Sequence, residues 1–367
     1  MSLRKPSLYD LHRSAGADFT EFGGWEMPVA FDSITREHEA VRSETGIFDV
    51  SHMGTLFIAG TDTAELLQRL TTNDVTTLSP GDIHYTCITR RDGVILDDTF
   101  LYNVPGRDDF LLVPNAGHDE AITERFVDHA EKWNLSVTVK NETEAFGMIA
   151  VQGPDAVEMV EGATRTQLDS LRRFSVTEIQ IGDVDCLISR TGYTGEDGFE
   201  LLYPNAAAEQ IWTAFDQCTP CGLGCRDTLR LEAGYLLSGQ DFHPSSNPRT
   251  PYEAKLGFVV ESTDPPAVGQ EALEEQREAG VDQQLIGIVV DGRGVARTGY
   301  DIVDPSTSDS VGSVTSGTMS PTFGEPLALG YVDVEYTQIG TDIGIQIRDR
   351  TIPATVVDHR FLETRSR

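Results

Sequence analysis

The amino-acid sequence predicts a multi-domain α+β protein whose C-terminal part is an all-β domain. The chain has 367 residues, which is long for one compact core and favours two or three domains. Up to about residue 262, apolar strands alternate with helical segments, so this part is expected to be an α+β body. From about Thr263 a linker-like segment and one helix lead into short strands separated by Gly, Pro and Asp. This pattern is typical of an antiparallel barrel or sandwich.

The first half of the body is expected to be a regular series of strands and helices. One helix ends at Gly46, and Asp62 stands where it can cap the next helix. The pair Asp92-Gly93 is a hairpin signal between two strands. The strands are expected over 55–60, 84–89, 94–104 and 109–115, and the helices over 31–46, 61–70 and 118–133.

The second half of the body repeats this arrangement in outline. Residues 56–67, LFIAGTDTAELL, and 149–160, IAVQGPDAVEMV, both pass from a strand through a glycine into a helix. Two related α+β units would produce such an echo. Further strands are expected over 175–181, 184–189 and 199–204, helices over 205–218, 226–237 and 270–280, and C-terminal strands over 284–290, 299–303, 313–317, 327–332, 343–349 and 352–357.

Acidic residues dominate the charge of the chain. It has 59 Asp and Glu against 28 Lys and Arg, a net charge of −31, and only four of the basic residues are lysine. Such a surface repels phosphate backbones, so a nucleic-acid partner is not expected. An acidic, lysine-poor surface fits a salt-rich cytosol, where screening confines self-repulsion to a few ångströms. We therefore expect a halophilic protein.

No segment predicts passage through a membrane. The longest apolar runs, such as LIGIVV, are far shorter than the roughly 20 residues that a spanning helix needs. The N-terminal segment lacks the basic and then apolar stretches of a signal peptide. A cytoplasmic protein without a membrane partner is expected.

Three of the five cysteines are close together, as Cys218, Cys221 and Cys225. Their C-x2-C-x3-C spacing suggests a metal site, but the segment offers no fourth cysteine or nearby histidine to close a ligand shell. Cys87 and Cys186 lie within apolar strands and read as small core residues. We expect no metal and, in a cytosolic chain, no disulfides.

The segment RTGYTGEDGFE, residues 190–200, is rich in glycine but is not a phosphate loop. Its spacing differs from G-x-G-x-x-G, it lacks Gly-Lys-Ser/Thr, and a strand rather than a helix follows it. A turn between strands accounts for the glycines in part. Because glycines also let another molecule approach the backbone, Tyr193 and Glu200 at the strand edges are candidates for a ligand pocket.

The segment GVILDDTFLYNV carries two adjacent aspartates. Side chains alternate along a strand, so Asp98 shares one face with the aromatic residues Phe100 and Tyr102, while Asp97 points the other way. A carboxylate among apolar and aromatic neighbours must find a hydrogen-bond partner or rise in pKa, and either outcome suits proton handling or ligand binding. A surface or helix-capping aspartate is the alternative interpretation.

Arg226 and Asp227 stand at the expected start of a helix. With Asp227 as the cap, Arg226 beside the helix N-terminus would make an anion or carbonyl site. The alternative is a structural ion pair between Arg226 and one of the many acidic neighbours.

Seven parts of the sequence together resemble the T protein, or aminomethyltransferase, family of the glycine cleavage system. They are FGGWEMPV, GIFDVSHMG, GVILDDTFLY, AVQGP, SRTGYTGEDGFE, GLGCRDTLRLEAGYLLSGQD, and SGTMSPTFG with ALGYV, in the family's order over almost the whole chain. The resemblance implies a cloverleaf around a folate channel. Its two related α+β domains would be 1–52 with 138–262 and 53–137, and its C-terminal antiparallel β-barrel 270–367.

The resemblance also implies the site residues. Asp98 would be the catalytic carboxylate beside the N5–N10 region of folate, in agreement with the face of the strand on which it lies. Glu200 and Arg226 would hold the pterin ring. The other folate contacts that the resemblance implies are Tyr85, Tyr102, Asn115, Tyr193, Tyr235 and Met53.

The activity that the resemblance implies is aminomethyl transfer to tetrahydrofolate. The aminomethyl carbon would pass from the lipoyl arm of a partner, the H protein, to tetrahydrofolate, with release of ammonia and formation of 5,10-methylenetetrahydrofolate. Positioning and proton transfer are sufficient for this reaction without a metal.

Two alternative functions stay open. One is a folate-dependent demethylase acting on sarcosine, dimethylglycine or a sulfonium compound, and the other is a non-catalytic folate-binding protein for iron–sulfur assembly. Oxidative demethylases usually carry a flavin domain, whose dinucleotide fingerprint is not found in this sequence. The iron–sulfur relatives place a cysteine where this chain has RTGYTG.

Overall fold

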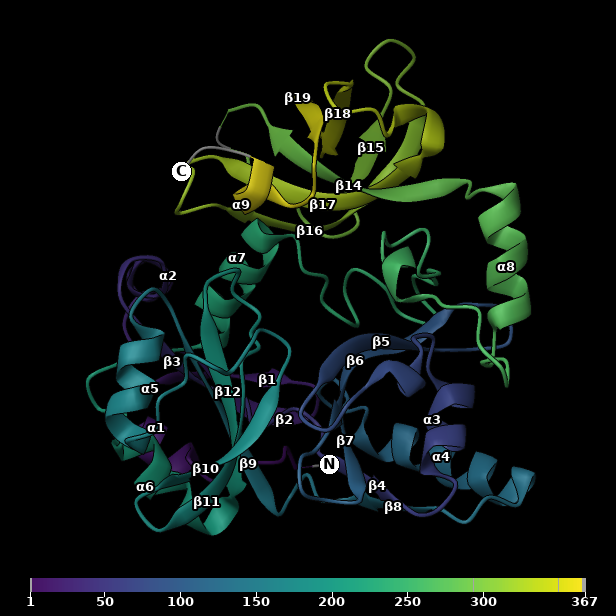
Figure 1. The fold of residues 1–367 in the computed structure, drawn as a ribbon. Coiled ribbons are helices and arrows are strands. Elements are labelled where there is room, and N and C mark those ends of the chain that lie inside the picture. Colours follow the sequence, from purple (N-terminus) through teal and green to yellow (C-terminus); the bar gives the residue numbers. More distant parts are fainter. Residues whose placement is uncertain (1, 293, 349, 365–367) are drawn as a thin grey trace. The chain divides into compact units, whose positions relative to one another are not determined.

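The computed structural model describes residues 2–292, 294–348 and 350–364, and these fall into two compact units (Figure 1). The first unit contains the described chain up to Ile88, Asp97–Arg226 and Thr263–Ala267. The second contains Thr89–Leu96, Asp227–Ser262 and the described chain from Val268 onwards. Within these ranges no helix is long and apolar enough to cross a membrane. The finer division into three domains stays a prediction.

A six-stranded sheet forms one layer of the first unit. Its order is β10-β11-β12-β9-β3-β13, with antiparallel neighbours except for the parallel pair β3 and β13. Helices α1, α5 and α6 pack against it over a core that includes Ile149, Phe199 and Tyr203 (Figure 1). The strands are β3 (Gly46–Asp49), β9 (Phe146–Gln152), β10 (Val176–Ile181), β11 (Val184–Ser189), β12 (Gly198–Pro204) and β13 (Thr219–Cys221), and the helices are α1 (Tyr9–Ser14), α5 (Ala156–Thr164) and α6 (Ala208–Thr213).

A five-stranded sheet carries the paired aspartates. Its order is β5-β6-β7-β4-β8, and the predicted Asp92-Gly93 turn joins β5 to β6, with Gly93 at φ 79°. Helix α4 packs against β8 and α3. The elements are β4 (Leu56–Ala59), α3 (Thr63–Leu70), β5 (Ile83–Thr89), β6 (Ile95–Asn103), β7 (Asp109–Val113), α4 (Asp119–Trp133) and β8 (Thr138–Asn141), preceded in the chain by the hairpin β1 (Asp18–Phe22) and β2 (Trp25–Ala30) and by α2 (Ile34–Ser43).

The second unit contains a closed barrel, so the barrel rather than the sandwich alternative is confirmed. Its order is β14-β17-β16-β15-β18-β19, and β19 pairs back with β14 around a core that includes Ile286, Ile302 and Val356. The strand predicted over 343–349 is β18, and its last expected residue, Asp349, lies outside the described residues. The elements are α7 (Leu223–Ala233, shared with the first unit), α8 (Gln270–Ala279), β14 (Gln283–Val290), β15 (Asp301–Val303), β16 (Ser310–Met319), β17 (Pro326–Asp333), β18 (Asp342–Ile347), β19 (Arg350–Val357) and α9 (Phe361–Thr364).

The predicted echo within the α+β body has a structural counterpart in two glycines. Gly60 follows β4 with φ 138°, and Gly153 follows β9 with φ 139°. A Cβ at either position would lie 2.2 Å from a backbone oxygen, that of Ser136 beside Gly60 and that of Glu44 beside Gly153. Both strand-to-helix turns therefore need glycine for the same two reasons, backbone conformation and close approach of another segment.

Two predicted helix caps are wrong. Asp62 precedes α3, but its side chain makes no capping hydrogen bond; its Oδ2 accepts from the backbone N–H of Ser136 at 2.6 Å. Helix α7 begins at Leu223, so Arg226 and Asp227 lie inside the helix and Asp227 is not its cap. In the first case a segment 74 residues away competes for the carboxylate.

A buried ion pair holds together the segment around Arg230 in the second unit. The guanidinium of Arg230 donates to Asp241 Oδ2 at 2.6 Å and to Ser316 Oγ at 2.8 Å. Asp241 Oδ1 accepts in turn from the hydroxyls of Thr315 at 2.5 Å and Ser316 at 2.6 Å. The side chains of Arg230 and Asp241 are 1% and 0% exposed, and the other carboxylate paired with Arg230, that of Asp227, is 45% exposed. Removal of Asp241 would therefore leave the buried guanidinium without its buried counter-charge.

Replacing Asp241 by alanine should therefore lower the free energy of unfolding by about 3–5 kcal/mol. The matched control is Asp32→Ala, which breaks an ion pair with Arg36 whose side chains are 61% and 75% exposed. The control should cost less than about 0.5 kcal/mol. Urea unfolding at one fixed salt concentration measures both. Equal losses in the two variants would contradict a structural role for the buried pair.

Candidate active site

Strand β6 places Asp98 on a half-buried, aromatic face. Its side chains alternate as predicted, with Asp97 0% exposed on one face and Asp98 on the other. One oxygen of Asp98 accepts a short hydrogen bond from the Tyr85 hydroxyl, and the other accepts from Asn115 Nδ2 at 2.7 Å. The Tyr85 ring packs in turn against Phe100, with centroids 5.5 Å apart. The structure thus brings together three of the proposed site residues, Asp98, Tyr85 and Asn115.

The surroundings of Asp98 favour its protonated form. Burial, and then the charge of Asp97, raise the pKa of Asp98 from 3.8 to about 6, although its two hydrogen-bond donors act in the opposite direction. Burial and the charge of Asp98 also raise the pKa of Tyr85 well above its ordinary value, so Tyr85 stays a hydroxyl donor. A carboxyl group with a pKa of about 6 can take up and release a proton near neutral pH.

Asn115 connects Asp98 to two residues that the sequence did not predict as part of the site. Its Nδ2 also donates to Asp97 Oδ1 at 2.8 Å, and its backbone N–H donates to Asp97 Oδ2 at 3.1 Å. His118, three residues further on, is hydrogen-bonded through Nδ1 to Asp97 Oδ1 at 2.9 Å. That hydrogen bond raises the pKa of His118 above 6.5, against the effect of burial. The alternation of β6 separates the two aspartates but does not reveal that one asparagine reaches both.

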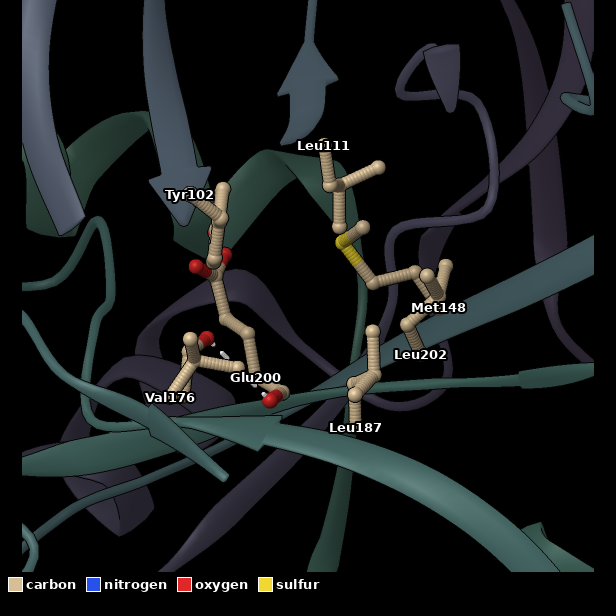
Figure 2. A pocket seen from close by; sticks show the side chains of 8 residues that line it. Tyr102, Leu111, Met148, Val176, Leu187, Glu200 and Leu202 are labelled. Carbon is tan, nitrogen blue, oxygen red and sulfur yellow. Dashed lines mark hydrogen bonds between the residues drawn. The ribbon is translucent and has the colours of Figure 1, made fainter. Parts of the chain in front are cut away.

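Glu200 lies on β12 beside a narrow cavity (Figure 2). Its Oε2 accepts from the Thr191 hydroxyl at 2.5 Å. Burial raises the pKa of Glu200, while that hydrogen bond and the charge of Arg226 lower it. Figure 2 shows the carboxylate directed towards Tyr102. The cavity has a volume of about 10 Å³, room for one water molecule. Its apolar lining residues are Leu111, Met148, Val176, Leu187 and Leu202.

Arg226 lies near the start of α7 and stacks on an aromatic ring. Its guanidinium carbon is 4.6 Å from the centroid of Tyr193, the geometry of a cation–π contact. Its charge also acts on Glu200, where it opposes the effect of burial. The structure therefore brings Tyr193, Glu200 and Arg226 together, and their contacts with folate stay predictions.

His52 is a buried neighbour of Arg226 that sequence reasoning missed. It is 0% exposed, and neither ring nitrogen has a hydrogen-bond partner among the described residues. Burial, and then the charge of Arg226, lower the pKa of His52 to about 3, so the ring is neutral near pH 7. The family resemblance implies a folate contact for the next residue, Met53, instead. Met53 lies half-buried in a turn that its own N–H closes on Val50 O at 3.0 Å.

Gly192, in the turn before β12, and Gly198, the first residue of β12, accommodate a side chain of the protein itself. A Cβ at Gly192 would lie 1.9 Å from Oε1 of Gln152, and a Cβ at Gly198 would lie 2.5 Å from its Nε2. The buried Gln152 amide donates to Thr191 O at 3.1 Å and accepts from Thr194 Oγ1 at 2.9 Å. The prediction that another molecule approaches the backbone at these two glycines is therefore wrong, because Gln152 fills that space.

The two remaining tyrosines of the proposed site belong to different units. Tyr102 lines the cavity together with Glu200, and burial and then the charge of Glu200 raise its pKa. Tyr235 belongs to the second unit, where its backbone N–H donates to Arg230 O at 2.9 Å. A contact of Tyr235 with folate stays a prediction.

Two of the three clustered cysteines lie close to a glutamate. The ligand atoms of Glu37, Cys221 and Cys225 lie within 4.8 Å of one another, and all three residues are buried. The Glu37 carboxylate already accepts three backbone N–H groups, two at Oε1 (2.7 and 2.9 Å) and one at Oε2 (2.8 Å). Three donors leave a tetrahedral zinc shell incomplete. These residues alone therefore do not form a closed structural zinc site, and the expected absence of a metal stays a prediction.

Two family descriptions match the two parts of the chain. Residues 8–264 match the GCVT N-terminal domain. Residues 283–363 match the glycine cleavage T-protein C-terminal barrel domain. The second match spans strands β14 to β19, which close the barrel.

Curated relatives are similar over their whole length. A probable aminomethyltransferase of Natronomonas pharaonis is 54% identical over 99% of this chain and 100% of the relative. A probable aminomethyltransferase of Haloarcula marismortui is 51% identical, with the same coverage. The aminomethyltransferase of Bacillus subtilis is 39% identical over 98% of this chain and 99% of the relative. The expectation of a halophilic protein, drawn from the acidic composition, agrees with the haloarchaeal origin of the first two relatives.

A solved structure has the same fold. The crystal structure of glycine cleavage system aminomethyltransferase T from Bartonella henselae matches with a TM-score of 0.91 at 31% identity, over 99% of each chain. The predicted α+β fold with a C-terminal antiparallel barrel is thereby confirmed. By its sequence matches and its fold, the chain belongs to the aminomethyltransferase family of glycine cleavage T proteins and is a transferase enzyme.

Proposed function

We propose that this protein is the tetrahydrofolate-dependent aminomethyltransferase of a glycine cleavage system. It moves the aminomethyl carbon from the lipoyl arm of H protein to tetrahydrofolate, releases ammonia and forms 5,10-methylenetetrahydrofolate. The observation that carries the proposal is Asp98, a carboxyl group with a pKa of about 6 that is held between Tyr85 and Asn115. The solved relative is itself a glycine cleavage system aminomethyltransferase, which supports the same reaction.

This reaction needs two protons to be moved. Two C–N bonds form, at N5 and N10 of folate, and each nitrogen loses one hydrogen. The C–N bond to ammonia and the C–S bond to the lipoyl arm break, so one proton ends on ammonia and the other on the lipoyl thiol. Asp98 can accept a proton from a folate nitrogen and return it to a leaving group, because its pKa lies near neutral pH. Tyr85 and Asn115 fix both of its oxygens in advance.

Glu200, Arg226 and Tyr193 are suited to recognise the pterin ring. A pterin carries N–H donors and a carbonyl oxygen along one edge. The carboxylate of Glu200 can accept from the donors, and the guanidinium of Arg226 can donate to the carbonyl. The other folate contacts that we propose are Asn115, Tyr85, Tyr102, Tyr235 and Met53.

The partners follow from the reaction. Lipoylated H protein supplies the one-carbon unit, and tetrahydrofolate is consumed as a substrate. The proton transfers and contacts proposed above use protein side chains and require no metal. The net charge of −31 opposes a nucleic-acid partner, and we place the reaction in the cytoplasm, away from membranes.

Replacing Asp98 by asparagine should remove proton transfer but keep the hydrogen bonds, because an amide can accept from Asn115 and donate to the Tyr85 oxygen. We expect ammonia release from aminomethylated H protein in the presence of tetrahydrofolate to fall about 10²–10⁴-fold. The Michaelis constant for folate should change by less than about threefold. Initial rates at high salt, with and without folate, measure both. The matched control is Asp128→Asn on the exposed side of α4.

Two results of that assay would contradict the proposal. A folded wild-type protein without folate stimulation would reject aminomethyl transfer and leave the demethylases, tested with sarcosine, dimethylglycine and a sulfonium compound, or a non-catalytic folate-binding protein. A fully active Asp98→Asn variant would retain the reaction but remove Asp98 from its catalytic role.

Replacing Glu200 by glutamine should weaken folate binding more than turnover. Loss of one charge-assisted hydrogen bond corresponds to about a 10–100-fold rise in the Michaelis constant for tetrahydrofolate. The rate at saturating folate should fall less than about threefold if Glu200 binds the ring equally in the ground and transition states. Steady-state kinetics with Glu178→Gln, an exposed residue of β10, as the control checks this. An unchanged Michaelis constant would show that Glu200 does not hold the pterin.

A further inference from the structure

A continuous hydrogen-bonded chain runs from Asp98 to a histidine outside the proposed folate contacts. Asn115 Nδ2 donates to Asp98 Oδ1 at 2.7 Å and to Asp97 Oδ1 at 2.8 Å. The same oxygen of Asp97 is 2.9 Å from Nδ1 of His118. The turn that carries Asn115 and His118 is closed by donation from the His118 backbone N–H to Asn115 O at 3.0 Å. The four residues therefore form one rigid unit on β6 and the segment after β7.

The charges around His118 are arranged to keep its ring protonated. Asp97 and, less directly, Asp98 and Asp119 face it. Asp119 already has a cationic partner, since Arg4 donates to its two oxygens at 2.9 and 3.0 Å. Asp97 is 0% exposed and receives neutral donors from Asn115, so the proton on His118 is what balances its charge.

Tyr85 and Cys87, which act electrostatically with Asp98, cannot supply a positive charge to balance the charge of Asp97. Burial raises the pKa of both Tyr85 and Cys87 well above their ordinary values, so both stay neutral. The charge of Asp97 raises the pKa of Asp98, second only to burial. A proton on His118 opposes that effect, because it places a positive charge against Asp97.

We propose that His118 is a positioning residue for the transfer reaction. It acts on Asp98 indirectly, through the shared hydrogen bonds of Asp97 and Asn115. It holds the Asn115 turn in place and keeps the Asp98 carboxylate ionised at the pH at which it must accept a proton. The role in catalysis rests on the proposed aminomethyl transfer, whereas the effect on Asp98 is a property of the protein alone.

The test is the pH dependence of the His118→Gln variant, which keeps an N–H donor for Asp97 but loses the charge. In wild type, the folate-stimulated rate of ammonia release should fall as the pH drops through about 6. In His118→Gln this acid limb should move about 0.5–1 pH unit higher. At the alkaline plateau the rate should stay within about twofold. His118→Lys, which restores a positive charge, should move the limb back towards wild type.

His129→Gln is the matched control. His129 lies on α4, where its Nδ1 is 2.8 Å from Arg125 O, and its replacement should leave the acid limb in place. All variants are compared at one salt concentration, because screening changes charge interactions. A loss of rate in His118→Gln by the same factor at every pH would indicate a structural effect and overturn the proposal.

A second measurement separates this inference from the proposed function. Carboxyl-¹³C NMR follows the titration of Asp98 without folate or H protein, with the resonance assigned by its loss in Asp98→Asn. A higher titration midpoint in His118→Gln supports the inference even if wild type proves not to release ammonia. An unchanged midpoint in a folded variant overturns it, whatever the enzyme does. A shifted midpoint with an unshifted acid limb overturns the role of His118 in the reaction.

Discussion

Two adjacent carboxylates on β6 set the conditions for the rest of the candidate active site. Asp97 and Asp98 point to opposite faces of the strand, yet Asn115 donates to both, so the two charges are coupled. A buried and a half-buried carboxylate this close cannot both ionise without cost, and part of this cost appears as the raised pKa of Asp98. The partners differ accordingly. Asp97 is paired with His118, which can carry a positive charge, while Asp98 receives the neutral hydroxyl of Tyr85.

The raised pKa of Asp98 lowers the stability of the folded protein near neutral pH. The pKa of Asp98 in the folded protein is about 6, above its ordinary value of 3.8. Between these values the folded protein binds more protons than the unfolded chain. The contribution of Asp98 to stability is therefore fully present below pH 3.8 and is lost as the pH rises through 6. A shift of this size corresponds to a cost on the order of 2–3 kcal/mol.

Sequence rules predicted what is local and missed what is brought together by pairing of distant strands. Alternation placed Asp98 on the aromatic face, and the short strands after the linker predicted an antiparallel barrel or sandwich, which the structure shows to be a closed barrel. Asn115 and His118 lie 18 and 21 residues from Asp97 and reach it only because β7 pairs with β6. The prediction for Gly192 and Gly198 was wrong for the same reason, since the side chain that fills their space, Gln152, comes from β9. Local rules named Tyr193, Glu200 and Arg226 as candidates for a ligand site, but their assignment to the pterin ring came from the family resemblance.

The acidity of the chain and the acidity of its candidate site are separate properties. The excess of 31 negative charges belongs largely to a surface where 1 M salt confines each charge's influence to about 3 Å. The coupling between Asp97 and His118 is screened much less, because Asp97 is fully buried and the two groups are in direct contact. Salt is therefore expected to act mainly on encounters between surfaces, such as the proposed docking of an H protein, and only weakly on the proton held at Asp98. A chain can thus gain surface carboxylates suited to high salt while Asp98 keeps the pKa that its own neighbours set.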